Sequence, residues 1–350
     1  GEDRGADGLA PWNLGVRPEG IAEVAQAHDG SLGTAHAYID AIADAGAHAV
    51  KFQTHFASEE STPAEPWRVK FSHKDESRYE YWQRMEFEPP EWRELKAHAD
   101  ERDLIFLSSP FSVKAIDLLM SLGVIAWKVA SGEVSNKPLI ARMAATKLPV
   151  LLSSGMSSWA ELDQAVAIVR ETGAPLSVIQ CTSAYPCPFE KIGSNVLQEI
   201  RDRYGCPTGL SDHSGTIFPG LHAASLGASL VEVHVTFHRK LFGPDVSSSI
   251  TMEELTQLVE GCRAIHTMRT HPMDKDAEAQ ALQPMRKLFT RSLITSRALT
   301  KGTILSHDDL VLKKPGSGLA DEHRRQLIGR QVSQDLPADH LIALQDVDPA

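Results

Sequence analysis

The feature that most restricts the fold of this chain is a regular alternation of short apolar runs with longer segments of helical periodicity. Eight runs have the composition of β-strands, at residues 21–26, 48–53, 104–110, 125–132, 149–155, 176–183, 208–213 and 230–235. One intervening segment repeats apolar residues at helical spacing after a Ser158–Glu161 capping box. Eight such units over roughly 250 residues predict parallel strands, helical crossovers and a (β/α)8 TIM barrel. No Gly-x-Gly-x-x-Gly motif follows the first run, which disfavours a dinucleotide fold.

Polar side chains stand at the end of every one of these runs. They are Glu23 and Gln26; Lys51 and Gln53; Ser108 and Ser109; Lys128, Ser131 and Glu133; Ser153 and Ser154; Thr182 and Ser183; Ser211, Asp212 and His213; and Glu232 and His234. In a TIM barrel the carboxyl ends of all strands meet at one face, where the active site lies. The sequence therefore predicts a polar site at the mouth of the barrel.

Lys51 and Lys128 lie among serines and glycine-containing turns (ASGE, SSGM). A lysine ammonium with serine hydroxyls and turn N–H groups suits a phosphate group. Two alternatives stay open: each lysine could be a barrel-interior residue paired with a glutamate, or one lysine could form a Schiff base. The presence of two cations favours a polyanionic substrate over the Schiff base.

His213 and His234 end adjacent strands, so their imidazoles could converge on one metal ion. An open coordination position would let such an ion act as a Lewis acid on a carbonyl group. The alternative is that both are ordinary core histidines. The other histidines, such as His36 and His73, are expected at the surface. Cys181 and Cys187 have no evident base beside them and are expected to be inert.

Composition narrows the functional classes. The formal net charge of −11 argues against a general binder of nucleic acids or anionic membranes. No run approaches the ~18 apolar residues of a membrane helix. Residues 1–15 lack a secretory pattern and are expected to be a flexible tail. The four cysteines show no CxxC pair or zinc-binding spacing, which is typical of reduced thiols in a cytoplasmic protein.

The strand-end residues occur within blocks that follow one another in order: AEVAQAHDGSLGTA, AVKFQTH, FLSSPF, WKVASGEVSNKPL, LLSSGM, QCTSAYP, GLSDHSG and HVTFHRKLFGPD. Together they resemble the sialic acid synthase family, over nearly everything from Ile21 to Asp348. The resemblance implies an enzyme that condenses phosphoenolpyruvate with an N-acyl hexosamine, such as N-acetylmannosamine, to give a nine-carbon 2-keto acid and phosphate.

The same resemblance implies roles for individual residues. It places phosphoenolpyruvate at Lys51, Ser109, Lys128, Ser131, Ser153, Ser183 and Ser211. It places a divalent metal, Mn²⁺ or Mg²⁺, at His213 and His234, and the amino sugar at Gln53, Glu133, Tyr185 and Asp245. Glu23 faces the same pocket, and Glu23 and Glu133 are the candidate proton-handling groups, which the sequence does not rank.

Some positions depart from the commoner family pattern, mainly on the acceptor side. HVTFHRKLFGPDVSSS stands where many members read His-Phe-Thr-Leu-Asp and Pro-Gly-Pro-Asp-His, so the identity of the sugar stays open. One alternative is a related phosphoenolpyruvate-dependent synthase with a phosphorylated acceptor. It would need extra Arg or Lys at the mouth, and none of the polar strand-end residues is Arg. The other is a carbohydrate-binding protein with an inert barrel, which the retained lysines, serines and histidines disfavour.

The predicted domain order is a catalytic barrel at residues 16–270, a linker at 271–287 and a β-rich antifreeze-like (SAF) domain at 288–350. In the family this domain covers the partner's barrel in a swapped homodimer, and its basic residue, here Lys314, reaches the acyl group. The alternative is that the loop around Lys314 is a solvated turn. The long segment 54–88 is rich in aromatic residues, which are expected to cover their own barrel or to pack against a second subunit.

Overall fold

The computed structural model describes residues 19–349, so the tail predicted at residues 1–15 lies outside the described residues. The chain forms two compact units and passes from the first to the second between Thr270 and His271. Each unit has an apolar core of its own. In the described part of the chain, no helix is long and apolar enough to cross a membrane.

The first unit is a parallel barrel of eight strands, which confirms the predicted fold class. The strands are β1 (Glu19–Ala25), β2 (Ala49–Thr54), β3 (Ile105–Pro110), β4 (Trp127–Val129), β5 (Val150–Ser153), β6 (Leu176–Cys181), β7 (Thr208–Asp212) and β8 (Leu230–Val235). Hydrogen-bonded neighbours follow the order β3-β2-β1-β8-β7-β6-β5-β4. The barrel is nearly closed, because β3 and β4 lie at the two ends of this order. A short strand, β9 (Ser249–Ile250), pairs with β8.

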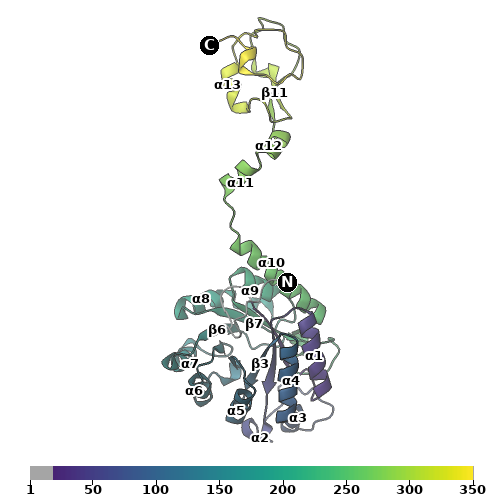
Figure 1. Cartoon of the computed structure of the whole chain (residues 1–350), viewed down its shortest axis with the longest axis vertical. Helices are drawn as coiled ribbons and strands as arrows, with labels where there is room; N and C mark the ends of the chain where they lie inside the picture. Colours follow the sequence, from purple (N-terminus) through teal and green to yellow (C-terminus); the bar gives the residue numbers. More distant parts are fainter. Residues whose placement is uncertain (1–18, 350) are drawn as a thin grey trace. The chain divides into compact units, whose positions relative to one another are not determined.

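Helices surround the strands (Figure 1). They are α1 (Leu32–Asp44), α2 (Ala57–Glu60), α3 (Arg78–Met85), α4 (Pro89–Glu101), α5 (Val113–Ser121), α6 (Lys137–Ala145), α7 (Trp159–Thr172), α8 (Ser194–Tyr204), α9 (Phe218–Ser225) and α10 (Met252–Thr270). In α7 the predicted capping box between Ser158 and Glu161 is present. The apolar residues at helical spacing are all buried; they are Leu162, Ala165, Val166 and Val169. Periodicity and capping residues therefore located this helix correctly.

The inside of the barrel is built in layers. An apolar cluster of Ile21, Ala49, Leu107, Ala126, Leu151, Ile179 and Leu230 fills one level. Because side chains two positions apart on a strand share a face, the next residues on that face form a second level. This second level is polar and comprises Glu23, Lys51, Ser109, Lys128, Ser153, Cys181, Ser211 and Glu232. The polar level lies next to the apolar level inside the barrel, and the side chains of both levels are buried.

The connection from β2 to β3 is the longest in the barrel. It contains α2, α3 and α4 together with an irregular stretch at residues 61–77. Tyr81 and Met85 are the buried residues of α3, and Trp67, Phe71 and Tyr81 pack edge-on or tilted against one another. The segment also contacts its own barrel, where Arg68 stacks over Tyr185 and Arg84 pairs with Asp29, in agreement with one of the two predicted arrangements.

The second unit begins with two short helices, α11 (Lys275–Ala281) and α12 (Gln283–Phe289), in and next to the segment 271–287 that was predicted as a linker. An antiparallel pair follows, β10 (Ser292–Thr295) with β11 (Leu310–Lys313), and then α13 (Arg324–Leu327). Isolated β-bridges, such as Leu299–Leu336, join the remaining loops around a small apolar core. The second unit is therefore held together by one short antiparallel ladder and isolated bridges rather than by long strands.

Candidate active site

A cavity of about 510 Å³ opens at the carboxyl ends of the barrel strands. Most residues predicted for the site line it: Lys51, Gln53, Lys128, Ser131, Glu133, Ser153, Ser183, Tyr185, Ser211, His213, His234 and Asp245. Glu23 and Ser109 do not line it; both are fully buried in the polar level of the barrel. Lys314 belongs to the second unit, where its ammonium lies 5.2 Å from the centre of the Phe289 ring.

Glu232 organises the floor of the cavity. Its Oε1 accepts hydrogen bonds from Lys128 Nζ at 3.1 Å, from Ser211 Oγ at 3.1 Å and from Lys51 Nζ at 3.4 Å. Lys51 Nζ also donates to Glu23, and Lys128 Nζ donates to Ser153 Oγ at 2.8 Å. Each lysine is therefore paired with a glutamate and at the same time borders the cavity.

Burial and charge act against each other in this network. Burial alone would raise the pKa of Glu232, but the charges of Lys128 and Lys51 bring it down to about 2. Burial lowers the pKa of the Lys51 ammonium to about 7, a shift that the Glu232 charge opposes. The network therefore favours the charged form of Glu232, whereas burial disfavours the charged form of Lys51. A bound anion would favour the charged form of Lys51 in turn.

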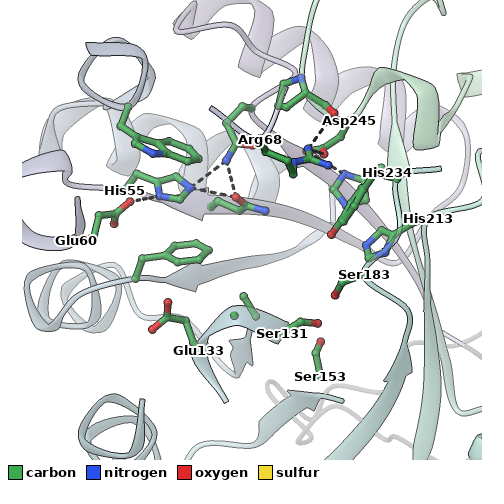
Figure 2. Close-up of a pocket in the computed structure, with 18 of the residues that line it drawn as sticks. His55, Glu60, Arg68, Ser131, Glu133, Ser153, Ser183, His213, His234 and Asp245 are labelled. Carbon is green, nitrogen blue, oxygen red and sulfur yellow. Dashed lines mark hydrogen bonds and ion pairs between the residues drawn. The ribbon is translucent and has the colours of Figure 1, made fainter. Parts of the chain in front are cut away.

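Three serines face this floor. Figure 2 shows Ser131, Ser153 and Ser183 gathered on one side of the cavity. Gly155 permits this arrangement, since a methyl group at its Cα would lie 2.5 Å from Ser131 Oγ and 2.7 Å from Ser183 Oγ. Among the described residues, the buried hydroxyls of Ser109 and Ser183 have no hydrogen-bond partner. Such unpartnered buried groups are rare in proteins and point to a missing partner.

His213 and His234 lie at one end of the cavity, with ring centres 5.2 Å apart. His213 Nδ1 lies 2.8 Å from the carbonyl oxygen of Thr182, so Nδ1–H donates and Nε2 keeps its lone pair. His234 Nδ1 lies 3.9 Å from an oxygen of Asp245. The Tyr185 ring packs against His213 at 4.2 Å. The two imidazoles therefore share one region of the cavity.

Cys181 is not isolated from a base, contrary to the sequence interpretation. Its Sγ lies 3.8 Å from His213 Nδ1 and accepts a hydrogen bond from Ser131 Oγ at 3.4 Å. Burial opposes ionisation of the thiol, but His213 outweighs this effect and lowers its pKa. Because spatial neighbours come from other strands, the sequence around Cys181 gave no sign of them.

The mouth of the cavity holds residues that the sequence interpretation missed. Arg68 and Arg78, both from the β2–β3 connection, line it, although none of the predicted strand-end residues is Arg. Arg68 donates to Asp245 at 2.7 Å and stacks over Tyr185 at 4.4 Å. Arg78 pairs with Glu65 at 3.1 Å. Arg68 lies in the irregular stretch and Arg78 is the first residue of α3, and no strand-end pattern indicated the position of either.

His55 is another residue at the mouth that the sequence interpretation missed. It is only 5% exposed, although it was expected at the surface. It lies on the same side of the cavity as Arg68 (Figure 2). On the opposite side Glu133 accepts a hydrogen bond from Asn136 at 2.8 Å. Burial raises the pKa of Glu133, and the Asn136 hydrogen bond only partly offsets this shift.

Comparison with known proteins gives a consistent result along the chain. The NeuB family matches residues 38–273, and the SAF domain matches residues 290–348. The N,N'-diacetyllegionaminic acid synthase of Campylobacter jejuni is 31% identical over 328 residues, which cover 92% of this chain and 98% of that protein. The human N-acetylneuraminate-9-phosphate synthase is 29% identical, over 94% of this chain and 92% of that protein. The crystal structure of an N-acetylneuraminic acid synthetase from Leptospira borgpetersenii, in complex with citrate, superposes with a TM-score of 0.68 at 30% identity, covering 77% of this chain and 93% of that one.

Proposed function

This chain belongs to the NeuB family of sugar acid synthases, and from that premise we propose that it condenses phosphoenolpyruvate with an N-acyl hexosamine. Water is the third reactant, and the products are phosphate and a nine-carbon 2-keto sugar acid. The observation that carries the proposal is the polar level of the barrel. Two buried lysines border a cavity in which several hydroxyls converge and at least one has no partner.

The residues of the floor suit phosphoenolpyruvate. Lys51 and Lys128 would contact its phosphate and carboxylate, while Ser131, Ser153 and Ser183 would donate hydrogen bonds. Glu232 holds the two ammonium groups in place without the ligand. Serine and lysine donors fixed in this way cost little reorganisation when the anion binds.

The reaction balances as follows. C3 of phosphoenolpyruvate attacks the aldehyde carbon of the open-chain sugar, which forms the new C–C bond. Water then adds at C2, and the C–O bond to the phosphoryl group breaks to release phosphate. The aldehyde oxygen becomes a hydroxyl, so it must gain one proton.

Glu133 is better placed than Glu23 to handle that proton. Glu133 lines the cavity, and burial raises its pKa toward the range useful for acid–base chemistry. Glu23 is fully buried and does not line the cavity, and its carboxylate already accepts hydrogen bonds from Lys51 and Gln53. In this proposal Glu133 takes the C1 hydroxyl proton when the sugar ring opens, while the former ring oxygen gains a proton from water. Glu133 then returns its proton to the aldehyde oxygen after C–C bond formation.

We also propose a divalent metal, Mn²⁺ or Mg²⁺, held by His213 and His234. The fit is supported by the Nδ1 contact of His213 with Thr182, which in the neutral imidazole leaves the lone pair on Nε2, and by the closeness of the two rings. The described residues contain no group of three His, Cys, Asp or Glu placed for a metal, so substrate and water would have to complete the coordination. When bound, the ion would supply Lewis-acid polarisation of the aldehyde oxygen.

A phosphorylated acceptor is the second candidate, because the mouth does contain arginine. Both arginines are, however, already paired: Arg68 with Asp245, and Arg78 with Glu65. Glu60 and Glu133 add further carboxylates to the same region. An added phosphomonoester would meet cations that are already paired and would lie near these additional carboxylates, so we favour an acceptor without phosphate.

An acceptor panel tests the proposal. Purified protein with Mn²⁺ and phosphoenolpyruvate is assayed for phosphate release with N-acetylmannosamine, a diacetamido hexose, N-acetylglucosamine and N-acetylmannosamine 6-phosphate. We expect release that depends on an unphosphorylated N-acyl hexosamine. Preference for the 6-phosphate would select the second candidate, and no acceptor-dependent release with any sugar would reject the proposed reaction.

A further inference from the structure

The His55 side chain is held on its ring faces and at both ring nitrogens. It is the first residue after β2, and its ring lies between two aromatic rings, Trp82 at 4.2 Å and Phe111 at 4.3 Å. Both pairs are stacked, with interplanar angles of 28° and 18°. The aromatic sandwich fixes the plane of the imidazole, while leaving its two nitrogens at the edge.

Both nitrogens are engaged. Nδ1 is hydrogen-bonded to the carboxylate of Glu60, in the turn of helix that follows β2. Nε2 lies 3.0 Å from Gln53 Oε1 and 2.9 Å from Gln26 Nε2. With its plane and both edges fixed, the imidazole has one orientation, and its Nε2 points at the side chains of Gln53 and Gln26.

Gln53 is thereby fixed as well. Its Oε1 accepts from Gln26 Nε2 at 2.5 Å and lies beside His55, while its Nε2 donates to Glu23 at 3.1 Å. These contacts determine which end of the carboxamide carries the oxygen. Gln53 still lines the cavity, so its remaining N–H is presented to a ligand in a defined arrangement.

We propose that His55 is a positioning residue for the acceptor sugar, acting through Gln53. Glu60 orients the imidazole, Trp82 and Phe111 hold its plane, and the imidazole sets the carboxamide that faces the acceptor. The inference rests on the proposed function, since it assigns the acceptor to the Gln53 side of the cavity. It adds His55 and Glu60 to the residues that govern acceptor binding.

Steady-state kinetics of His55→Phe test this role. Phenylalanine keeps the stack between Trp82 and Phe111 but removes both polar edges. We expect the KM for the acceptor to rise about tenfold, the usual effect of losing roughly one hydrogen bond's worth of orientation. The KM for phosphoenolpyruvate should stay within twofold, because the lysine floor is untouched. His55→Gln, whose amide can still reach Gln53, should recover part of the loss.

Two further variants make the result specific. His73→Phe removes an exposed imidazole outside the network and should leave both KM values unchanged. Glu60→Gln keeps the stack and an oxygen for the Phe56 N–H, and it replaces the charged partner of Nδ1 with a neutral one. It therefore carries the same test if His55→Phe unfolds at a lower temperature. Combining Glu60→Gln with His55→Phe should add little, because both act through one ring.

The outcomes separate this inference from the proposed function. Wild-type turnover with an unchanged acceptor KM in both His55→Phe and Glu60→Gln would overturn the role of His55 and leave the function standing. An equal rise in both KM values would also overturn it, since that indicates a structural effect. Absence of acceptor-dependent turnover in the wild-type protein would remove the function and the inference together.

Discussion

The ammonium group of Lys128 donates hydrogen bonds to Glu232 and Ser153, and the same side chain lines the cavity. If it contacts phosphoenolpyruvate, Lys128→Met should weaken binding of that substrate by about 2 kcal/mol, the range of a charge-assisted hydrogen bond. Calorimetric titration measures this directly. Lys137→Met, at the exposed start of α6, is the control and should bind normally. Unchanged affinity in Lys128→Met would leave this lysine as a purely internal partner of Glu232.

Glu133 makes a prediction about pH. Its pKa is raised by burial, so its carboxylate becomes protonated at a higher pH than the ordinary ~4.3. If the charged form accepts a proton from the sugar, kcat should fall on the acid side as pH drops through this raised pKa. Glu133→Gln should lower kcat by at least about a hundredfold, within the usual range for general acid–base groups, and should remove the acid limb. An acid limb that persists in the variant would assign it to another group.

Single residues also show what the sequence could and could not predict. Lys51, Lys128 and Glu232 were predicted at one site because parallel strands bring their carboxyl ends together. The partners of Cys181 and the burial of Glu23 depend on contacts across strands, which a single sequence does not contain. Arg68 lies in an irregular stretch without periodicity, so no rule connected it with Asp245 or Tyr185.

At the scale of the elements, the close approach of the loop after β5 to Ser131 and Ser183 depends on Gly155. Gly155→Ala would place a methyl group against the hydroxyls of Ser131 and Ser183, which must then move. We expect the KM for phosphoenolpyruvate to rise about tenfold. The unfolding temperature should change little, since only side-chain ends are displaced. Gly33→Ala, in the open first turn of α1, is the matched control and should leave the KM unchanged. Equal KM values in the two variants would contradict a hydroxyl cradle at this loop.

Elements with a repeating pattern were predicted well, and the irregular connection was not. The helix α7 was located by its capping box and its apolar face, because both depend only on neighbours in sequence. The segment at residues 54–88 offered only its aromatic content, which fitted two arrangements. Its packing on its own barrel depends on contacts such as His55 with Trp82, which follow from the tertiary fold alone.

At the scale of the whole molecule, two units with separate cores lie on one chain. We propose a homodimer in which the second unit of one subunit completes the acceptor site of the other. A chain that ends at residue 285 should then keep a folded barrel and bind the acceptor poorly. Mixing this truncated chain with full-length Lys128→Ala should restore some activity, because one site in the mixed dimer regains both intact parts. A fully active monomer at high dilution would rule out this arrangement.

The central claim is the condensation itself, and one isotope measurement tests it most directly. Phosphoenolpyruvate labelled with ¹⁸O at the bridging oxygen is incubated with the protein, Mn²⁺ and an N-acyl hexosamine, and both products are analysed by mass spectrometry. The proposed mechanism predicts a nine-carbon 2-keto acid without the label and phosphate that carries it, because the C–O bond breaks. Label-free phosphate, or phosphate released without a nine-carbon product, would contradict it.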